Sequence, residues 1–291
     1  MKTKIILIAV MICSVGAFAQ GNQIENKKGV KIMPEQGDFG VGINALPVLM
    51  YIGDLFGSGS NNTALGGNKF TSVFASNTLY GKYMLTENTA IRGHLRIGVF
   101  NNTFRNELDD DGQVDPNFML TDVYKRSSSV YNIGGGYEWR RGTTRLRGLY
   151  GGELFYQHVQ GLKGDYSYGN RIQEGNEFAT STVWGSGGNV EGEFPVIERI
   201  LSTTGGNYNG IGLRAFAGVE YFIAPKICIG TEFGWGATYG TVSSRETVYE
   251  FWDTSGDTDF TNTRSVLDSG SSSLRIDTDN FNGAIYFMFY F

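Results

Sequence analysis

The sequence has few of the residues on which disulfide, metal and histidine chemistry depends. Its 291 residues include 2 cysteines, 2 histidines and 5 prolines. Cys13 lies in a leader-like segment, which leaves Cys228 as the single cysteine of the remaining chain. A lone cysteine excludes an internal disulfide, and no CxxC motif is present to bind zinc. GxSxG, HExxH and P-loop motifs are also absent.

Long hydrophobic runs and positive charge are scarce as well. After residue 19 no stretch reaches 18 consecutive apolar residues, which excludes a transmembrane helix from the rest of the sequence. Lys and Arg number 24 against 29 Asp and Glu, for a formal net charge of -5. This balance argues against nucleic acid as a partner, because phosphate binding needs a basic patch. By contrast, 42 glycines and 14% aromatic residues favour a β-rich chain with many turns.

The first residues have the three parts of a secretory signal peptide. Lys2 and Lys4 precede the apolar run IILIAVMIC, and the small-residue pattern AFA ends just before Gln20. This order is typical of a cleaved export signal, and the apolar run is too short to span a bilayer. We therefore expect a signal peptide at 1–19, a polar periplasmic lead at 20–36 and one domain at 37–291. An uncleaved anchor and a lipoprotein are the alternatives.

Eight stretches of the chain alternate apolar and polar residues with a period of two, which predicts β-strands. Short links join some of these stretches, at 86–88, 141–144 and 224–226. Long links alternate with the short ones, at about 57–73, 106–128, 161–209 and 241–271. An even number of strands with tight turns at one end and long loops at the other is typical of outer-membrane barrels.

Charged residues in these stretches fall on the phase opposite to the apolar one. A charge that faces the middle of a bilayer costs a barrel about 2 to 4 kcal/mol, so we expect the uncharged phase to face lipid. The interior of an eight-stranded barrel is filled by its own side chains, so the charges are expected to pair there as a plug. A narrow pore with exchanging salt bridges and a soluble, lipocalin-like barrel with reversed faces are the alternatives. The expected lumen charge network is Lys82, Arg92, Arg96, Glu138, Arg147, Glu153, Arg214, Glu220 and Glu232.

Three segments carry a resemblance to a known family: the leader end AFAQ, the first strand GDFGVGIN, and a last strand, GAIYFMFYF, that closes on Phe291. On these the chain resembles the OmpA-type outer-membrane β-barrel family, in the form common in Bacteroidetes, over about residues 37–291.

The resemblance implies an all-β fold, a transmembrane up-and-down antiparallel β-barrel of eight strands with short periplasmic turns and long extracellular loops. The implied location is the bacterial outer membrane, among lipid and lipopolysaccharide. The family also implies that the barrel-assembly machinery recognises the C-terminal strand, although Phe281 stands where that signal usually has a polar residue. No counterpart of the family's peptidoglycan-binding domain is present, so a cell-wall anchoring role is not carried over.

Three of the four long links are acidic, with net charges of -4 for 106–128, -3 for 161–209 and -4 for 241–271, whereas 57–73 has +1. Acidic loops suit bridging divalent cations or a basic partner. The segment DDDGQVD contains a calcium candidate, Asp109, Asp111 and Asp115, but lacks the spacing and closing Glu of a full calcium loop; a solvated turn is the alternative. Within loop 161–209, FPVIERIL has Pro195 at a possible helix start, and could dock a protein partner or pack within the loops.

Histidine chemistry offers little support for an enzyme. A hydrolase needs a His within hydrogen-bond distance of a nucleophile or carboxylate. His94 is expected in the lumen network, and His158 is expected on the lipid-facing phase near the loop end of its strand, with Ser167 and Glu153 nearby in sequence. We therefore expect no enzymatic activity and no cofactor. The leading hypothesis is a structural or partner-binding envelope barrel; a narrow passive channel for ions or small solutes and a membrane-embedded lipid acyl hydrolase are the alternatives.

Overall fold

The computed structural model describes residues 24–45, 78–113, 118–185, 187–255, 260–278 and 284–291. Over these residues the chain is all-β: fifteen strands pair antiparallel, and no helix is present. The expected all-β, antiparallel class is therefore confirmed. No helix in this part of the chain is long and apolar enough to cross a membrane. The expected signal peptide and the link at 57–73 lie outside the described residues.

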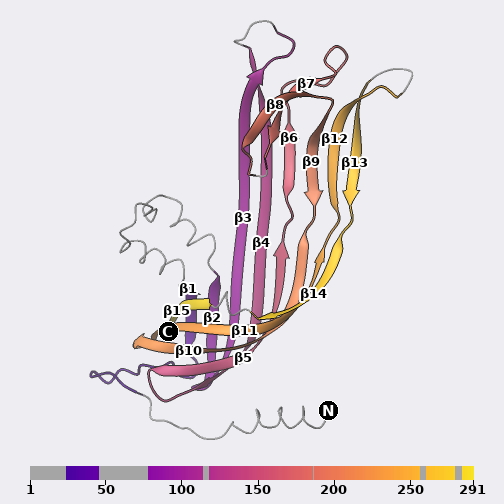
Figure 1. The fold of residues 1–291 in the computed structure, drawn as a ribbon. Helices are drawn as coiled ribbons and strands as arrows, with labels where there is room; N and C mark the ends of the chain where they lie inside the picture. Colours follow the sequence, from indigo (N-terminus) through magenta and orange to yellow (C-terminus); the bar gives the residue numbers. More distant parts are fainter. Residues whose placement is uncertain (1–23, 46–77, 114–117, 186, 256–259, 279–283) are drawn as a thin grey trace, which may run out of the picture.

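Figure 1 shows that strands make up most of the described chain. β3 and β4 are the longest, with 21 and 23 residues. In order, the strands are β1 (Phe39–Asn44), β2 (Leu79–Thr86), β3 (Thr89–Asp109), β4 (Met119–Arg141), β5 (Leu146–Val159), β6 (Lys163–Ser167), β7 (Ala179–Trp184), β8 (Val190–Val196), β9 (Glu198–Gly205), β10 (Tyr208–Ala224), β11 (Ile227–Val242), β12 (Arg245–Asp253), β13 (Phe260–Asp268), β14 (Ser271–Thr278) and β15 (Ala284–Tyr290).

Eight of the strands pair each with the next, and the last of the eight pairs with the first. We call this set the ring. Antiparallel pairs join β1 to β2, β2 to β3, β3 to β4 and β4 to β5. The pairs continue from β5 to β10, from β10 to β11, from β11 to β15, and from β15 back to β1. At the last junction Phe39 N donates to Phe291 O at 3.2 Å, and Phe291 N donates to Phe39 O at 2.9 Å.

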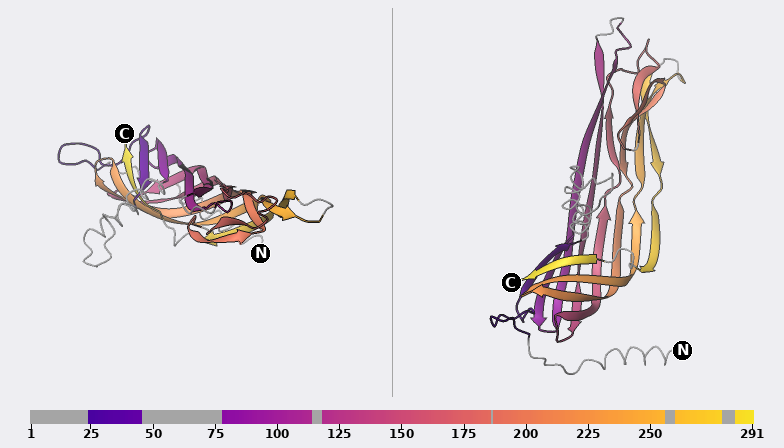
Figure 2. Two further views of the ribbon diagram at one scale, coloured as in Figure 1. Left: turned by 90° about the horizontal axis from the view of Figure 1, so that it is seen from above. Right: turned by 60° about the vertical axis from the view of Figure 1, so that its left-hand side comes forward.

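The same sheet extends beyond the ring, and we call this extension the wall (Figure 2). It begins where β5 ends: β5 pairs with Val130–Arg141 of β4, and β6 pairs with Val123–Ser127 of the same strand. From β6 the pairing runs on to β9, β12 and β13, while the far half of β3 continues along β4 on the other side. The hairpin of β7 and β8 forms a separate two-stranded sheet.

The expected count of eight strands is wrong, because three of the four segments expected to be long loops are largely strands. Residues 106–128 hold the ends of β3 and β4, residues 161–209 hold β6 to β9, and residues 241–271 hold β12 and β13. FPVIERIL, expected to begin a helical turn at Pro195, instead spans β8 and β9. Neither face of β12 or β13 is buried, so these strands lack the apolar alternation on which the prediction depended.

Close-packed glycines mark the level where the ring continues into the wall. A Cβ on Gly161 would lie 2.1 Å from Gly205 O, and a Cβ on Gly205 would lie 2.2 Å from Ser244 O. A Cβ on Gly270 would lie 2.4 Å from Val242 O. Gly205 also has a φ of 89°, which favours glycine. At this level β5 gives way to β6, β10 follows β9, and β11 gives way to β12, whereas β3 passes from ring to wall unbroken (Figure 1).

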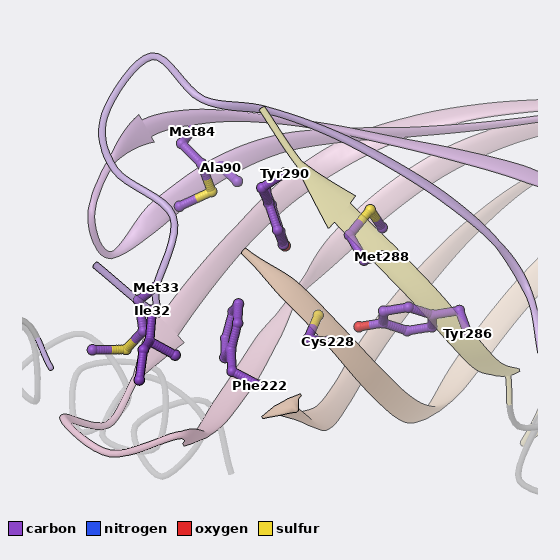
Figure 3. Packing of buried hydrophobic residues seen from close by; sticks show 9 residues of the cluster. All are labelled: Ile32, Met33, Met84, Ala90, Phe222, Cys228, Tyr286, Met288 and Tyr290. Carbon is purple, nitrogen blue, oxygen red and sulfur yellow. The ribbon is translucent and has the colours of Figure 1, made fainter. Parts of the chain in front are cut away.

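The described part of the expected polar lead folds back over one end of the ring. Ile32 and Met33 are buried, and Figure 3 shows them beside Phe222 in the hydrophobic cluster at this end. Lys226 N donates to Ile32 O at 2.8 Å, and Lys226 Nζ lies 2.8 Å from Asp38 Oδ2. This segment is therefore fixed to the turn between β10 and β11 by backbone, ionic and apolar contacts.

Gly205→Ala tests the close approach of backbones at the junction. We expect it to lower the free energy of unfolding by about 2 to 5 kcal/mol, because the methyl group adds backbone strain to a steric clash. The measurement is urea unfolding followed by tryptophan fluorescence.

Gly175→Ala is the matched control. Gly175 has a φ of 83°, but nothing lies within 4 Å of its added Cβ, so it isolates the backbone strain. Equal losses at the two positions would contradict a tight junction.

Candidate functional site

The charged residues of the ring occupy matched positions on paired strands. Lys82 of β2 lies opposite Arg92 of β3, and Glu153 of β5 lies opposite Arg214 of β10. Side chains alternate between the two faces of a strand, so residues opposite one another share a face. Lys82, Arg92 and Glu153 are all buried. The register of the ring therefore collects its charges on the inner face.

Glu220 of β10 is the centre of the first group of ion pairs. Its Oε1 accepts hydrogen bonds from Lys82 Nζ at 2.7 Å and Tyr286 Oη at 2.9 Å, and its Oε2 accepts one from Arg140 Nη2. Glu138 lies 2.7 Å from Lys82 Nζ and 3.5 Å from Arg140 Nε, measured from its carboxylate oxygens. Both carboxylates are fully buried. Two cations are thus shared between two anions, with a tyrosine hydroxyl as a further donor.

Arg92 and Arg214 form the second group with two more carboxylates. Arg92 donates to both oxygens of Glu232, at 2.8 and 3.0 Å, in a bidentate pair. Arg214 Nη1 is shared between Glu232 Oε1 at 2.9 Å and Glu153 Oε1 at 3.1 Å. Arg92 Nη1 also lies 3.4 Å from Glu138 Oε2, which links the two groups. The result is one continuous network across the inside of the ring.

The network is electrically balanced, with four cations and four carboxylates. Moving a charge out of water costs several kcal/mol, and only close, hydrogen-bonded partners compensate that cost. Because the groups share partners, removal of any one leaves a neighbour buried and unpaired. The network consists of Lys82, Arg92, Arg140, Arg214, Glu138, Glu153, Glu220 and Glu232.

Two residues of the expected network lie elsewhere. Arg147 is at a turn end of the ring, where it donates to Gly142 O, Glu87 O and Asn88 Oδ1, each at 3.0 Å. Arg96 is further along β3, and its Nε is buried without a hydrogen-bond partner among the described residues. The other expected members are brought together in the network.

Sequence reasoning missed Arg140 and Tyr286. Arg140 stands two residues after Glu138 and so shares its phase, a signal that could have identified it. Tyr286 precedes Phe287 in the last strand, on the phase opposite to the apolar one. The sequence gives no sign that its hydroxyl would donate to Glu220, because an aromatic residue in an apolar strand is expected to make apolar contacts.

The outer face of the ring carries large apolar side chains that are exposed, and we call this surface the belt. One register row crosses it from β3 to β11 through Leu95, Ile133, Tyr156, Ile211 and Tyr239. The side chains of this row are 39% to 56% exposed. A large contiguous apolar surface on a monomer marks an interface with another protein or with lipid.

The residues considered for a hydrolase are not brought together. His158 lies opposite Tyr131 on β4, whereas Ser167 lies opposite Val123 of the same strand. Eight residues of strand separate these positions, or about 26 Å. His158 Nδ1 is instead 2.8 Å from Asn209 Oδ1.

The other histidine lies inside the ring. His94 Nε2 is 2.9 Å from Asn132 Oδ1, and His94 Nδ1 is 3.9 Å from Glu153 Oε2. His94 therefore borders the ion-pair network, on the side of Glu153.

The calcium candidate falls at the tip of the β3–β4 hairpin. Asp111 Oδ2 accepts hydrogen bonds from Thr180 N at 2.7 Å and Asn176 Nδ2 at 3.1 Å, so it fastens the start of β7 to this tip. Asp109 ends β3, and Asp115 lies outside the described residues. Within the described ranges no group of three or more His, Cys, Asp or Glu could hold a metal ion.

No family model and no curated protein matches the chain. The resemblance to the OmpA-type family therefore remains a prediction from the sequence. The site consists of the ion-pair network inside the ring and the belt outside it.

Glu220→Ala tests the network. We expect it to lower the free energy of unfolding by about 3 to 5 kcal/mol, because Lys82 and Arg140 would lose a buried carboxylate that they share. Urea unfolding of the purified protein measures the change.

The control is Glu246→Ala, which removes a carboxylate whose contact with Ser265 is exposed. It should cost less than about 1 kcal/mol. A loss at Glu220 no larger than that at Glu246 would show that the ion pairs do not hold the ring.

Proposed function

We propose that the chain is a non-enzymatic β-barrel of the bacterial outer membrane, sealed to solutes, whose wall projects outside the bilayer as a structural and partner-binding surface. One observation carries this proposal: the ring has its charges inside and its large apolar side chains outside. A water-soluble barrel would have the reverse distribution, because apolar burial stabilises a soluble fold.

Closure of the pairing around the ring supports a place in lipid. A bilayer has no water to satisfy backbone groups, so a spanning sheet must leave no unpaired edge. The pairing of β15 with β1 supplies partners to the two strands that would otherwise be edges. The eight strands of the ring would then form the barrel. Of the additional strands, β14 pairs with the Trp235–Val242 part of β11, and the others belong to the wall and the β7–β8 hairpin.

The height of the belt fits the thickness of a bilayer. On β3 the exposed apolar residues run from Ile91 to Val99, about 26 Å along the strand and roughly 18 to 22 Å across a membrane at the tilt of a barrel strand. That span is close to the apolar band of outer-membrane barrels, about 25 Å tall. Beyond Val99 the same face carries Asn101, Thr103 and Arg105, all exposed. The rest of β3 would therefore stand in water, as part of the wall.

Two features that block the interior of the ring favour a sealed barrel over a channel. The ion-pair network crosses the middle of the ring, and Ile32 and Met33 cover the end where the turns are short. A solute would have to break buried ion pairs and displace an apolar plug to pass. Lipid and lipopolysaccharide would contact the belt, and the barrel-assembly machinery would recognise β15.

Quenching by brominated lipid tests the placement in a bilayer. Trp235 is 50% exposed on the belt, whereas Trp252 lies in the wall, opposite Thr261. We expect lipids brominated on their acyl chains to quench a variant that retains only Trp235, and to leave a variant that retains only Trp252 almost unchanged. Fluorescence after reconstitution into vesicles measures both.

Replacement of the other tryptophans by phenylalanine makes the two variants matched controls for one another. Equal quenching in both, or a protein that stays in the aqueous phase, would overturn the membrane assignment.

Planar-bilayer recording tests the seal. We expect the intact chain to give no stable unitary current steps, because charge pairing and the apolar plug both block the interior. Insertion is first established in the same lipid by quenching of Trp235. Reproducible steps from inserted protein would favour the channel alternative.

A further inference from the structure

The wall contains a cavity of about 470 Å³, well away from the ion-pair network. Residues 171–173, which we call the strap, line it. Thr261 Oγ1 donates to Ile172 O at 2.5 Å, which fixes the strap to β13. The cavity is also lined by Tyr166 and Tyr168 near β6, Leu201 of β9 and Glu250 of β12. A volume of this size is within the usual range for small-molecule sites.

Two tyrosine rings give the cavity an aromatic side. The rings of Tyr166 and Tyr168 are nearly parallel, with centroids 6.5 Å apart and planes 8° apart. Tyr124 stacks against Tyr166 at 4.4 Å, and Tyr168 Oη donates to Ile200 O at 2.9 Å. Burial raises the pKa of Tyr168, so this hydroxyl remains a neutral donor. Both rings are therefore held in position by the wall itself.

A buried arginine and a carboxylate supply polar groups to the same cavity. Arg199 stands over the Tyr168 ring at 4.3 Å, and its Nε and Nη2 lie 2.9 and 2.8 Å from Glu250 Oε2. Arg199 Nη1 also donates to Asn170 O and Ser181 Oγ, each at 2.8 Å. Because the ion pair uses Oε2, the Oε1 atom of Glu250 remains an acceptor among the described residues. Arg171 and Gln173 of the strap are exposed at the rim.

We propose that this cavity binds a saccharide. The C–H groups of a sugar ring carry slight positive charge and pack against aromatic rings. Tyr124 and Arg199 each cover one face of the two tyrosine rings, so this contact would use the parts of Tyr166 and Tyr168 that line the cavity. Sugar hydroxyls both donate and accept hydrogen bonds, so they need a mixture of donors and acceptors. The guanidinium of Arg171, the amide of Gln173 and the carboxylate of Glu250 provide that mixture. A bare anion would need donors alone, and a metal ion would need a cluster of ligands.

This inference goes beyond the proposed function and does not depend on the bilayer. The same ring chemistry belongs to free saccharides and to the head group of a glycolipid. If the belt did not enter lipid, the cavity would still be present in the wall.

The experiment is a calorimetric titration of the full chain in detergent micelles with maltose, chitobiose and a disaccharide of glucuronic acid. We expect saturable binding of at least one of the three. Arg171→Ala and Gln173→Ala should each weaken it about two- to tenfold, because each removes one hydrogen-bonding group at the rim. Both side chains are exposed, so the variants are expected to fold as the parent does.

Glu246→Gln is the matched control, since it changes a carboxylate on β12 outside the cavity and should leave binding unchanged. Displacement of the bound disaccharide by lipopolysaccharide would identify a glycolipid head group as a ligand, and absence of displacement would identify a free saccharide. No binding by any of the three sugars, or equal binding by the parent and both rim variants, would overturn the proposal.

Discussion

The rest of the structure depends on pairing of buried charge inside the ring. Eight ionised side chains can lie out of water only because each carboxylate has at least two cations at ion-pair distance, and Glu138 has three. Because the charges pair inside the ring, the outward-facing residues of the same strands can be apolar. A slip of one residue in the pairing would move every charge to the outer face, so the charged inner face also fixes which residues point outward. The ion pairs inside and the belt outside therefore both follow from the alternation of charged and apolar residues along each strand.

The junction between ring and wall shows how the same strands serve two environments. Gly161, Gly205 and Gly270 let neighbouring backbones approach where a side chain would separate them. Below this level the sheet has a buried inner face and large apolar residues outside, whereas above it neither face of β12 or β13 is buried. The sheet therefore changes in burial along its strands without a change of fold, and the aromatic cavity lies entirely in the wall.

The all-β class and most of the network could be predicted from the sequence, because charges such as Glu153 and Arg214 recur with a strict period of two. The wall could not, since β13 has no buried face and pairs with β12, which has none either. Ile32 and Met33 were included in a polar lead because their partners, such as Phe222, are far away in sequence. The cavity also draws its residues from distant segments, Tyr168, Glu250 and Thr261 among them, which no local pattern connects.

The hydrogen bonds between Phe39 and Phe291 join the first strand of the ring to the last residue of the chain. This seam has the largest sequence separation that the ring contains, so its closure carries the highest entropic cost and sets a high contact order. During synthesis β1 and β11 each lack a neighbour until β15 has been made. The hairpins can form early, but the pairing of the ring is completed only by β15, and until then both unsatisfied edges need protection from other chains.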